Sequence, residues 1–488
     1  MKKISILFFC ILSAGSLLAQ TKSLTLQECL QMALEESKSI KIKQEEVKMA
    51  ERTQSEAKTA YLPKIDASAA YLHLSDKIYL LSHDKFLPIG TKMPDGSFGF
   101  RPDQVAGTVL PNGQWAPTDA NGVPFDPKQN PEKIQWNDYT TIPREELAID
   151  AHNTFLGTVS LIQPVYMGGK IRTMNKMTEI GVDIARQQEQ MEKTETMYNV
   201  EAAYWLVISL ENKVKTVQEY QKLLLKLESD VAELEKEGMA VKSDMLKVKV
   251  KLNEVNMGLS KAQNGLSLSK MQLCQYIGLP LNTDIKLLDE KPARMAIPHT
   301  DINNVWQNRV EIKSLEKVTE LSAKKEKLAI SGYLPQIGLM ANYMFTNPDF
   351  FNGFEKEFHG SWNVGVTMKI PIVHWGENRH KVQSAKHERR IAEIQLDEAK
   401  EKIELQYNQA NFQMDEANKQ VLAANSHMEE AEENLRFAKL AFGEGLAGVT
   451  EVMEAQTAWY QAMSEKEDAE IEYRLKNLYL KKVNGTLE

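Results

Sequence analysis

Acidic residues follow two glycine turns that lie far apart in the chain. Glu451 and Glu454 follow Gly445, and Asp244 follows Gly238. Carboxylates at a helix start ordinarily face solvent, because negative charge is favourable near a helix N-terminus. If several copies of the chain bring these turns together at a pore mouth, the same carboxylates form a ring that attracts cations and repels anions. Both interpretations stay open from the residues alone.

Residues 443–448 read GEGLAG, which formally matches the glycine motif of dinucleotide-binding proteins. That motif requires a preceding strand within a βαβ unit, whereas this segment follows a long helical pattern. The corresponding segment around Gly238 reads EGMAVKS and lacks the motif. We therefore interpret both glycine segments as helix-to-helix turns, in which glycine adopts the positive φ angles that reverse the chain.

Three histidines lie near one another, namely His374, His380 and His387. Spacings of six and seven do not bring neighbours onto one helical face within reach of a metal ion, as a spacing of four would. The chain also shows no serine nucleophile elbow, phosphate-binding glycine loop or pair of catalytic carboxylates in a strand–turn context. We predict that it is not an enzyme and holds no metal or cofactor.

The chain repeats its landmarks, which places these turns in a larger pattern. Residues 61–71 read YLPKIDASAAY and residues 333–343 read YLPQIGLMANY, an offset of 333−61 = 272. Three later landmarks share a smaller offset, because 371−164, 445−238 and 485−278 all equal 207. The first half therefore holds 272−207 = 65 additional residues. A duplicated unit predicts one pseudo-symmetric body, with a first repeat over 20–277 and a second over 301–488.

Helical patterns fill most of both repeats. Two very long ones run from about 170 to 237 and from about 377 to 442, with apolar residues at spacings of three and four. Helices of this length predict coiled-coil packing. Four shorter stretches cover roughly 26–61, 243–276, 303–333 and 450–482. Two short helices end to end match one long helix, so we expect a cylinder of uniform height, with the proline-containing linker 278–300 at the mid-height joint.

Four segments alternate between apolar and polar or small residues and predict strands. They are 64–73, 154–163, 336–345 and 361–371. In the last of these, Trp362, Val364 and Val366 face one way, while Asn363 and Thr367 face the other. Alternation over about ten residues is typical of outer-membrane strands, although a strand of a soluble sheet looks similar. Between the first two strands lies 74–152, rich in proline and glycine, which we expect to form a surface loop.

Residues 1–19 begin with Lys2 and Lys3 and continue as an apolar run, which predicts a secretory signal peptide. The sequence after this segment contains no run of about 18 apolar residues, so it predicts no membrane-spanning helix. The formal charge of −8 becomes −8 − 2 = −10 without those lysines, which speaks against a nucleic-acid partner.

Three cysteines are present, and none predicts a disulfide framework. Cys10 lies inside the signal segment and is a poor site for a lipid anchor. Cys29 and Cys274 remain after processing, and two cysteines in a chain of this length favour buried thiols.

Taken together, these features resemble the TolC-type outer membrane efflux proteins, also called outer membrane factors. The resemblance covers nearly all of the chain after the signal peptide. It rests on Tyr-Leu-Pro where helix passes into strand, on Pro and Gly where strand returns to helix, and on an acidic residue six positions after each turn glycine. The most specific segment is GLAGVTEVMEAQTAWYQA, residues 445–462. The prolines at the expected helix–strand junctions are Pro63, Pro335, Pro164 and Pro371.

The resemblance implies a mostly α fold with a transmembrane β portion. A homotrimer would share a 12-stranded β-barrel, to which each copy gives four strands, above an α-helical barrel. The chain would lie in the outer membrane of a Gram-negative bacterium, in contact with lipid, and extend into the periplasm. Its partners would be a periplasmic adaptor (membrane fusion) protein and an inner-membrane RND or ABC transporter.

The resemblance also assigns roles to the two turns. It places Gly238, Met239, Gly445 and Leu446 at the surface where the adaptor docks. Asp244, Glu451 and Glu454 match acidic positions at the closed end of the channel. Phe442 stands where a tyrosine often occurs, and Ala447 stands where some members have arginine. Neither side chain can form the corresponding hydrogen bond, so the residues that hold this gate closed must differ.

We therefore expect a passive exit duct for an efflux or type I secretion system. Four strands alone would leave two open edges in lipid, so the sheet must close by association. Eight strands would be filled by side chains whereas twelve leave a passage, but the residues do not choose between two and three copies. A periplasmic structural coiled-coil protein without a channel is the alternative, although it has no use for the four alternating strands.

Overall fold

The computed structural model describes residues 22–94, 98–288 and 302–487, and the chain divides into two compact units. A helical unit comprises the chain up to Ala60, Gly168–Leu334 and the chain from Pro371 onward. A sheet unit comprises Tyr61–Met167 and Pro335–Ile370. Both units draw on both sequence repeats. The predicted signal peptide, Cys10 and residues 289–300 of the predicted linker lie outside the described residues.

Two helices of equal length dominate the helical unit. Helices α3 (Lys170–Lys236) and α7 (Glu377–Gly443) contain 67 residues each, which at 1.5 Å per residue corresponds to about 100 Å. Each begins directly after a glycine in the left-handed region, Gly169 at φ 77° and Gly376 at φ 83°. The two long helices predicted from apolar spacing are thus confirmed.

The shorter helices form two sets. Helices α4 (Lys242–Tyr276) and α8 (Val449–Val483) have 35 residues each and agree with the prediction. The other two predicted helices are each divided, into α1 (Leu26–Glu36) and α2 (Lys38–Thr59), and into α5 (Ile302–Asn308) and α6 (Val310–Ile330). A 3₁₀ turn, η3 (Ser331–Tyr333), follows α6. Expecting one unbroken helix over each stretch was wrong.

The breaks at Ser37 and Arg309 have a common cause. They are 309−37 = 272 residues apart, the offset of the Tyr-Leu-Pro segments. The two glycines that follow α4 and α8 pack onto the residue before each break: a Cβ on Gly278 would lie 2.6 Å from Cβ of Glu36, and one on Gly485 would lie 2.9 Å from Cβ of Asn308. The ends of the half-length helices therefore meet the other helix pair at the break, which local helical patterns do not reveal.

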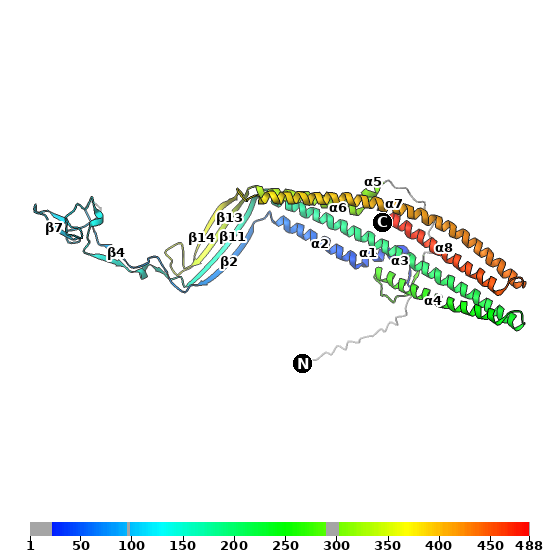
Figure 1. Cartoon of the computed structure of the whole chain (residues 1–488). Coiled ribbons are helices and arrows are strands. Elements are labelled where there is room, and N and C mark those ends of the chain that lie inside the picture. The colour runs from blue at the N-terminus through cyan, green and yellow to red at the C-terminus, as the bar shows by residue number, and fades with distance from the viewer. Residues whose placement is uncertain (1–21, 95–97, 289–301, 488) are drawn as a thin grey trace, which may run out of the picture. The chain divides into compact units, whose positions relative to one another are not determined.

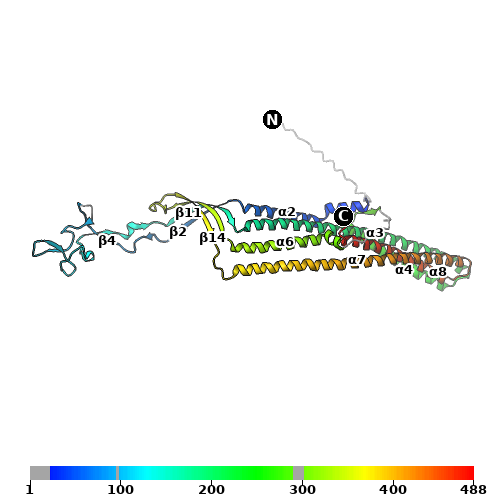
Figure 2. The same cartoon turned by 90° about the horizontal axis from the view of Figure 1, so that it is seen from above.

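The helices form a layer in which each long helix spans two shorter ones. Helix α3 packs against α2, α4, α6 and α8, and α7 packs against α6 and α8. In Figure 2 the helices α2, α3, α6 and α7 lie side by side in this order. Helix α2 or α4 thus forms one edge of the layer and α7 the other.

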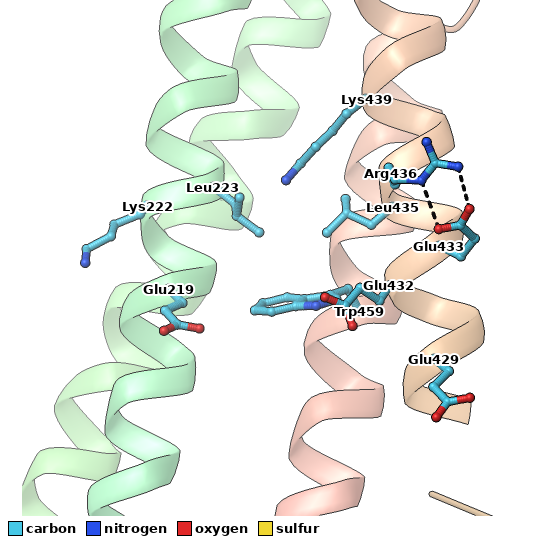
Figure 3. Close-up of a pocket in the computed structure, with 10 residues that line it drawn as sticks. All are labelled: Glu219, Lys222, Leu223, Glu429, Glu432, Glu433, Leu435, Arg436, Lys439 and Trp459. Carbon is cyan, nitrogen blue, oxygen red and sulfur yellow. Dashed lines mark hydrogen bonds and ion pairs between the residues drawn. The ribbon is translucent and has the colours of Figure 1, made fainter. Parts of the chain in front are cut away.

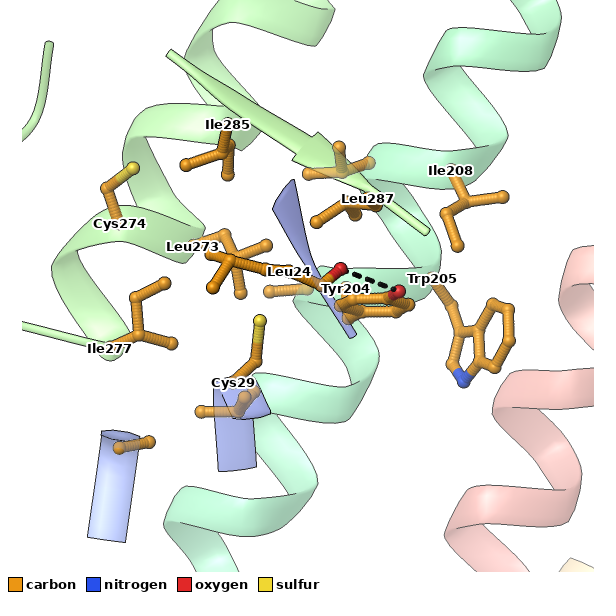
Figure 4. Packing of buried hydrophobic residues seen from close by; sticks show 14 residues of the cluster. Leu24, Cys29, Tyr204, Trp205, Ile208, Leu273, Cys274, Ile277, Ile285 and Leu287 are labelled. Carbon is orange, nitrogen blue, oxygen red and sulfur yellow. Dashed lines mark hydrogen bonds between the residues drawn. The ribbon is translucent and has the colours of Figure 1, made fainter. Parts of the chain in front are cut away.

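A hydrophobic cluster fills the helical unit beside the first break. Leu24, Tyr204 and Leu273 are almost fully buried in it, and so are the thiols of Cys29 and Cys274 (Figure 4). The two cysteines form no disulfide, as predicted, and burial raises the pKa of the Cys274 thiol. Two strands that the sequence did not predict, β1 (Lys22–Leu24) and β12 (Ile285–Leu287), pair in parallel over this cluster.

The sheet unit contains the four predicted strands in one antiparallel sheet. Strands β2 (Lys64–His73), β11 (Asn153–Met167), β13 (Gln336–Asn347) and β14 (His359–Lys369) lie in the order β14-β13-β11-β2 (Figure 1). All neighbours in this sheet are antiparallel. The strand predictions are therefore confirmed, and β11 continues four residues beyond the predicted end.

The register of the sheet aligns the alternating residues of the four strands, so that the sheet has two distinct faces. One row across the sheet reads Ile65, Leu161, Ala341 and Val364, and a row on the opposite face reads Asp66, Ser160, Asn342 and Asn363. Asn342 donates a 3.0 Å hydrogen bond from Nδ2 to Oδ1 of Asn363 within the second row. A slip of one residue would mix these faces, so the register specifies one apolar and one polar surface.

The segment 74–152 is a folded extension of the β2–β11 hairpin. Strand pairs continue the hairpin outward, and Phe100 packs its ring against Trp115 and Trp136 with centroids 6.2 and 6.0 Å apart. The elements are β3 (Ile78–Tyr79), β4 (Lys85–Pro88), β5 (Thr91–Lys92), β6 (Phe98–Gly99), β7 (Gly107–Val109), β8 (Trp115–Pro117), η1 (Pro131–Lys133), β9 (Tyr139–Ile142), η2 (Arg144–Leu147) and β10 (Ala148–Ile149).

Candidate functional site: the two helix turns

The turns α3–α4 and α7–α8 share one backbone geometry. Gly238 and Gly445 have φ angles of 75° and 73°. The N–H of Met239 donates to the carbonyl of Leu234 at 2.8 Å, and the N–H of Leu446 donates to the carbonyl of Ala441 at 2.8 Å. Each bond closes the C-terminal end of a 67-residue helix, and a left-handed glycine is the residue that such an ending favours.

Both turns present an apolar side chain at the same position. Met239 is 68% exposed and Leu446 is 84% exposed. A single exposed apolar residue needs no explanation on a protein surface. Two exposed apolar residues at corresponding positions of two turns with the same hydrogen bonds form a repeated feature, which is available for contact with a partner.

The acidic residues of the two turns have different local partners. Asp244 accepts from Nζ of Lys247 at 3.1 Å, and the same Nζ reaches Oγ1 of Thr450 at 3.3 Å, which links the two turns. Glu451 accepts from the N–H of Gly448, the residue directly before α8. Glu454 is exposed and forms no ion pair within the described part of the chain. Glu451 is therefore engaged in stabilising the start of α8.

Phe442 and Ala447 pack in the turn region without polar contacts of their side chains. Phe442 lies against a cluster of buried apolar residues from α3, α4 and α8. The cluster contains Leu227, Val231, Met245, Val248, Val449 and Val452. Ala447 is half-buried, and its N–H donates to the carbonyl of Ala441 at 3.2 Å. Apolar contacts thus hold these helices together, beside the polar link from Lys247 to Thr450.

A charged groove lies between α3, α7 and α8, and the sequence reasoning missed it. Its volume is about 750 Å³, with α3 on one wall, α7 on the other and Trp459 of α8 between them (Figure 3). Arg436 donates from Nε to Glu433 at 2.9 Å on the α7 wall. Burial lowers the pKa of Lys439, which points from α7 toward α3 in Figure 3. The signal in the sequence was a run of charged residues on α7 at helical spacing: Glu429, Glu432, Glu433 and Arg436.

Three of the four prolines expected at helix–strand junctions lie near a strand end, and the fourth does not. Pro63 and Pro335 directly precede β2 and β13, and Pro371 follows β14 by two residues. Pro164 instead lies inside β11, which continues to Met167, so its assignment to a junction was wrong. The register of β11 against β13 shifts between Pro164 and Tyr166. Such an irregularity accommodates a residue without an N–H inside a strand.

The three histidines singled out in the sequence lie apart from these turns. His374 has its Nδ1 3.8 Å from a carboxylate oxygen of Glu377, at the start of α7. Among the described residues no group of three or more His, Cys, Asp or Glu side chains is arranged to hold a metal ion. In the same residues no helix is long and apolar enough to cross a membrane.

Residues 302–486, within the second repeat, match the family model described as outer membrane efflux protein. The resemblance predicted from the sequence is confirmed. No curated protein matches the chain. The fold, however, is shared almost end to end with solved structures.

Three solved structures illustrate the shared fold. The outer membrane protein VceC from Vibrio cholerae has 13% identity and a TM-score of 0.67, with 94% of this chain and 96% of that chain covered. The Campylobacter jejuni CmeC outer membrane channel has 14% identity and a TM-score of 0.67, with 95% and 86% covered. The Neisseria gonorrhoeae MtrE outer membrane channel, in its open state, has 14% identity and a TM-score of 0.69, with 95% and 89% covered. At these identities the likeness establishes the fold alone.

Proposed function

We propose that the chain is an outer-membrane exit duct, a passive channel that leads from the periplasm to the outside of a Gram-negative bacterium. It serves a tripartite efflux or type I secretion system. A periplasmic adaptor connects it to an RND or ABC transporter in the inner membrane, which supplies the energy. The family match over 302–486 and the likeness to outer membrane channels over more than nine-tenths of the chain support this proposal.

The four-stranded sheet carries the proposal. Its register collects apolar side chains on one face, and Trp362, Val364 and Val366 of β14 are all well exposed there. A face of this composition suits lipid, and the opposite row of Asp66, Ser160, Asn342 and Asn363 suits a water-filled interior. A structural coiled-coil protein has no need of such a sheet.

The open edges of the sheet explain why copies must associate. Among the residues that the structure describes, strands β14 and β2 each have one unpaired side. Unpaired backbone groups in lipid cost several kcal/mol each, so the edges must pair with other copies. Because every neighbouring pair is antiparallel, β2 and β14 run in opposite directions, and β14 of one copy can pair antiparallel with β2 of the next. Three copies then form a closed barrel of 12 strands.

The helical layer offers matching edges for the same association. Exposed apolar side chains lie along α4, on one edge, and along α7, on the other. Those on α4 are Leu246, Val250, Met257 and Leu268, and those on α7 include Ile394, Leu405, Phe412 and Leu422. Their burial between copies would close an α-helical barrel, since such stripes favour helix–helix packing.

The two turns are the proposed contact with the adaptor and the proposed gate. Gly238, Met239, Gly445 and Leu446 supply the docking surface, because two exposed apolar side chains stand on rigid turns at corresponding positions. Asp244, Glu451 and Glu454 supply negative charge at the mouth, while Phe442 and Ala447 belong to the apolar contacts of the closed end. Neither the docking surface nor the charge at the mouth indicates which cargo passes through the duct.

Reconstitution tests the proposal directly. Full-length protein purified from outer membranes in detergent should be a trimer by light scattering and should produce stepwise cation-selective conductance in planar bilayers. A protein that is released from cells without detergent, or that never conducts although it is trimeric, would instead favour the periplasmic scaffold. A deletion strain tested against toxic compounds and secreted proteins then separates efflux from type I secretion.

A further inference from the structure

Trp375 occupies an unusual position between β14 and α7. Its side chain is 95% exposed, and its backbone has a φ of 46°, in the left-handed region that residues other than glycine avoid. The corresponding residue of the first repeat, 375−207 = 168, is Gly168 at φ 61°. The chain therefore holds a bulky aromatic residue where the same turn elsewhere uses glycine.

Among the described residues no contact compensates the strain at Trp375. Trp375 has no hydrogen bond, ion pair or ring contact within the described residues. At Gly168, by contrast, an added Cβ would lie 2.7 Å from Cβ of Leu334, so the first repeat excludes a side chain there. Strained residues persist where surrounding interactions favour them, which points to an interaction of Trp375 with a partner outside the chain.

The neighbours of Trp375 indicate the kind of partner. Ile372 is 88% exposed and Val373 is 62% exposed, so four of the five residues of Pro371–Trp375 are apolar, with His374 as the exception. The other three passages between helix and strand also carry an exposed ring, on Tyr61, Tyr166 and Tyr333. Tryptophan and tyrosine concentrate where a bilayer meets water, because the ring is apolar and its N–H or O–H is polar.

We propose that Trp375, with Ile372 and Val373, inserts into the lipid headgroup region at the helix end of β14 and anchors this passage to the bilayer. The inference rests on the proposed function, because it needs the sheet to lie in a membrane. Trp375 follows the last residue of β14, Lys369, by six positions. Six residues span at most about 20 Å, so the ring stays within reach of the boundary at which the lipid face of the strand ends.

Depth-dependent quenching of tryptophan fluorescence tests this placement. The full-length protein is reconstituted in nanodiscs that contain phosphatidylcholine with a nitroxide on the headgroup or on carbon 12 of an acyl chain. The emission of each tryptophan is obtained as the difference between wild type and the variants W375F, W362F or W306F. We expect Trp375 to be quenched at least twofold more by the headgroup probe, Trp362 more by the acyl probe, and Trp306 of α5 by neither.

The outcomes separate the two proposals. If Trp362 is quenched and Trp375 is not, Trp375 faces water or another copy of the chain and this inference is overturned, while the duct stands. If neither is quenched, the sheet does not lie in lipid and both fail.

A glycine substitution gives a second, independent readout. W375G places at this turn the residue found in the first repeat, so its melting temperature in detergent should equal or exceed that of wild type. The increase in melting temperature from detergent to nanodiscs should be smaller for W375G than for wild type. W375F should retain most of the wild-type increase. An equal increase in all three proteins would exclude an anchoring role.

Discussion

The turns α3–α4 and α7–α8 have the same backbone and different charges. Gly238 and Gly445 adopt the same conformation and the same hydrogen bonds follow them. Asp244 corresponds to Glu451 and Lys247 to Glu454, since 451−244 and 454−247 both equal 207. The first turn therefore holds an internal ion pair, whereas the second has two acids. The backbone geometry of each turn requires glycine at this position, whereas the neighbouring surface positions are free to differ between the repeats.

The largest effect is expected where the proposed barrel would place both repeats in contact with lipid. Val159 and Val366 are 366−159 = 207 residues apart and lie on the apolar face of β11 and β14. V159R or V366R should each destabilise the barrel by about 2–4 kcal/mol per copy, because a charge at mid-membrane is costly. The yield of folded oligomer on unheated gels measures this. S160R and T367R are the matched controls on the opposite face, and equal tolerance of arginine on both faces would reverse our assignment of lipid and interior.

A smaller effect is expected from the turn glycines. G238V and G445V should each cost about 1–3 kcal/mol, because a β-branched residue is strained at positive φ. No atom lies within 4 Å of a Cβ built at either glycine, so the cost is conformational and should be similar in both. Chemical denaturation in detergent measures it. Asparagine tolerates this conformation, so G238N and G445N should be milder, and a large difference between the two valine variants would break the equivalence of the turns.

The charge difference should affect conduction rather than folding. E451Q combined with E454Q should reduce cation selectivity in planar bilayers, while trimer assembly stays unchanged, because the side-chain oxygen of a glutamine at 451 can also accept from the N–H of Gly448. K247E makes the first turn resemble the second and should increase selectivity. Trivalent cations at low salt should block wild type more strongly than the double variant, since the attraction is electrostatic and screened by salt. Identical selectivity and block in all proteins would show that these acids are ordinary solvated residues.

The smallest effect is expected from the region present in one repeat only. Replacement of 74–152 by a linker of about 15 residues, comparable to the β13–β14 connection, should leave the folded trimer intact, because the segment pairs mainly with itself. Size-exclusion chromatography and melting temperature report the result. Loss of the oligomer would mean that contacts of this segment hold the barrel together.

Much of the fold was predictable because its signals are local. Apolar spacing placed α3, α4, α7 and α8 to within two residues, and alternation located all four long strands. The turn glycines were predictable for the same reason, since a helix ending needs a particular φ. The candidate site was less predictable: Glu451 was expected at a gate and is also a helix cap, and the groove beside Trp459 depends on three helices from both repeats.

By itself the sequence determined the duplication, the lengths of α3, α4, α7 and α8 and the two faces of each strand, because chain periodicity and backbone preference act within a few residues. Only the tertiary structure decided which strands become neighbours and in which register, so that Asp66, Ser160, Asn342 and Asn363 form one polar row. It likewise decided the helix breaks at Ser37 and Arg309, where glycines some 175 to 240 residues away pack against the chain. These features depend on contacts between distant segments, whose free energy arises only when the chain has closed the loops between them.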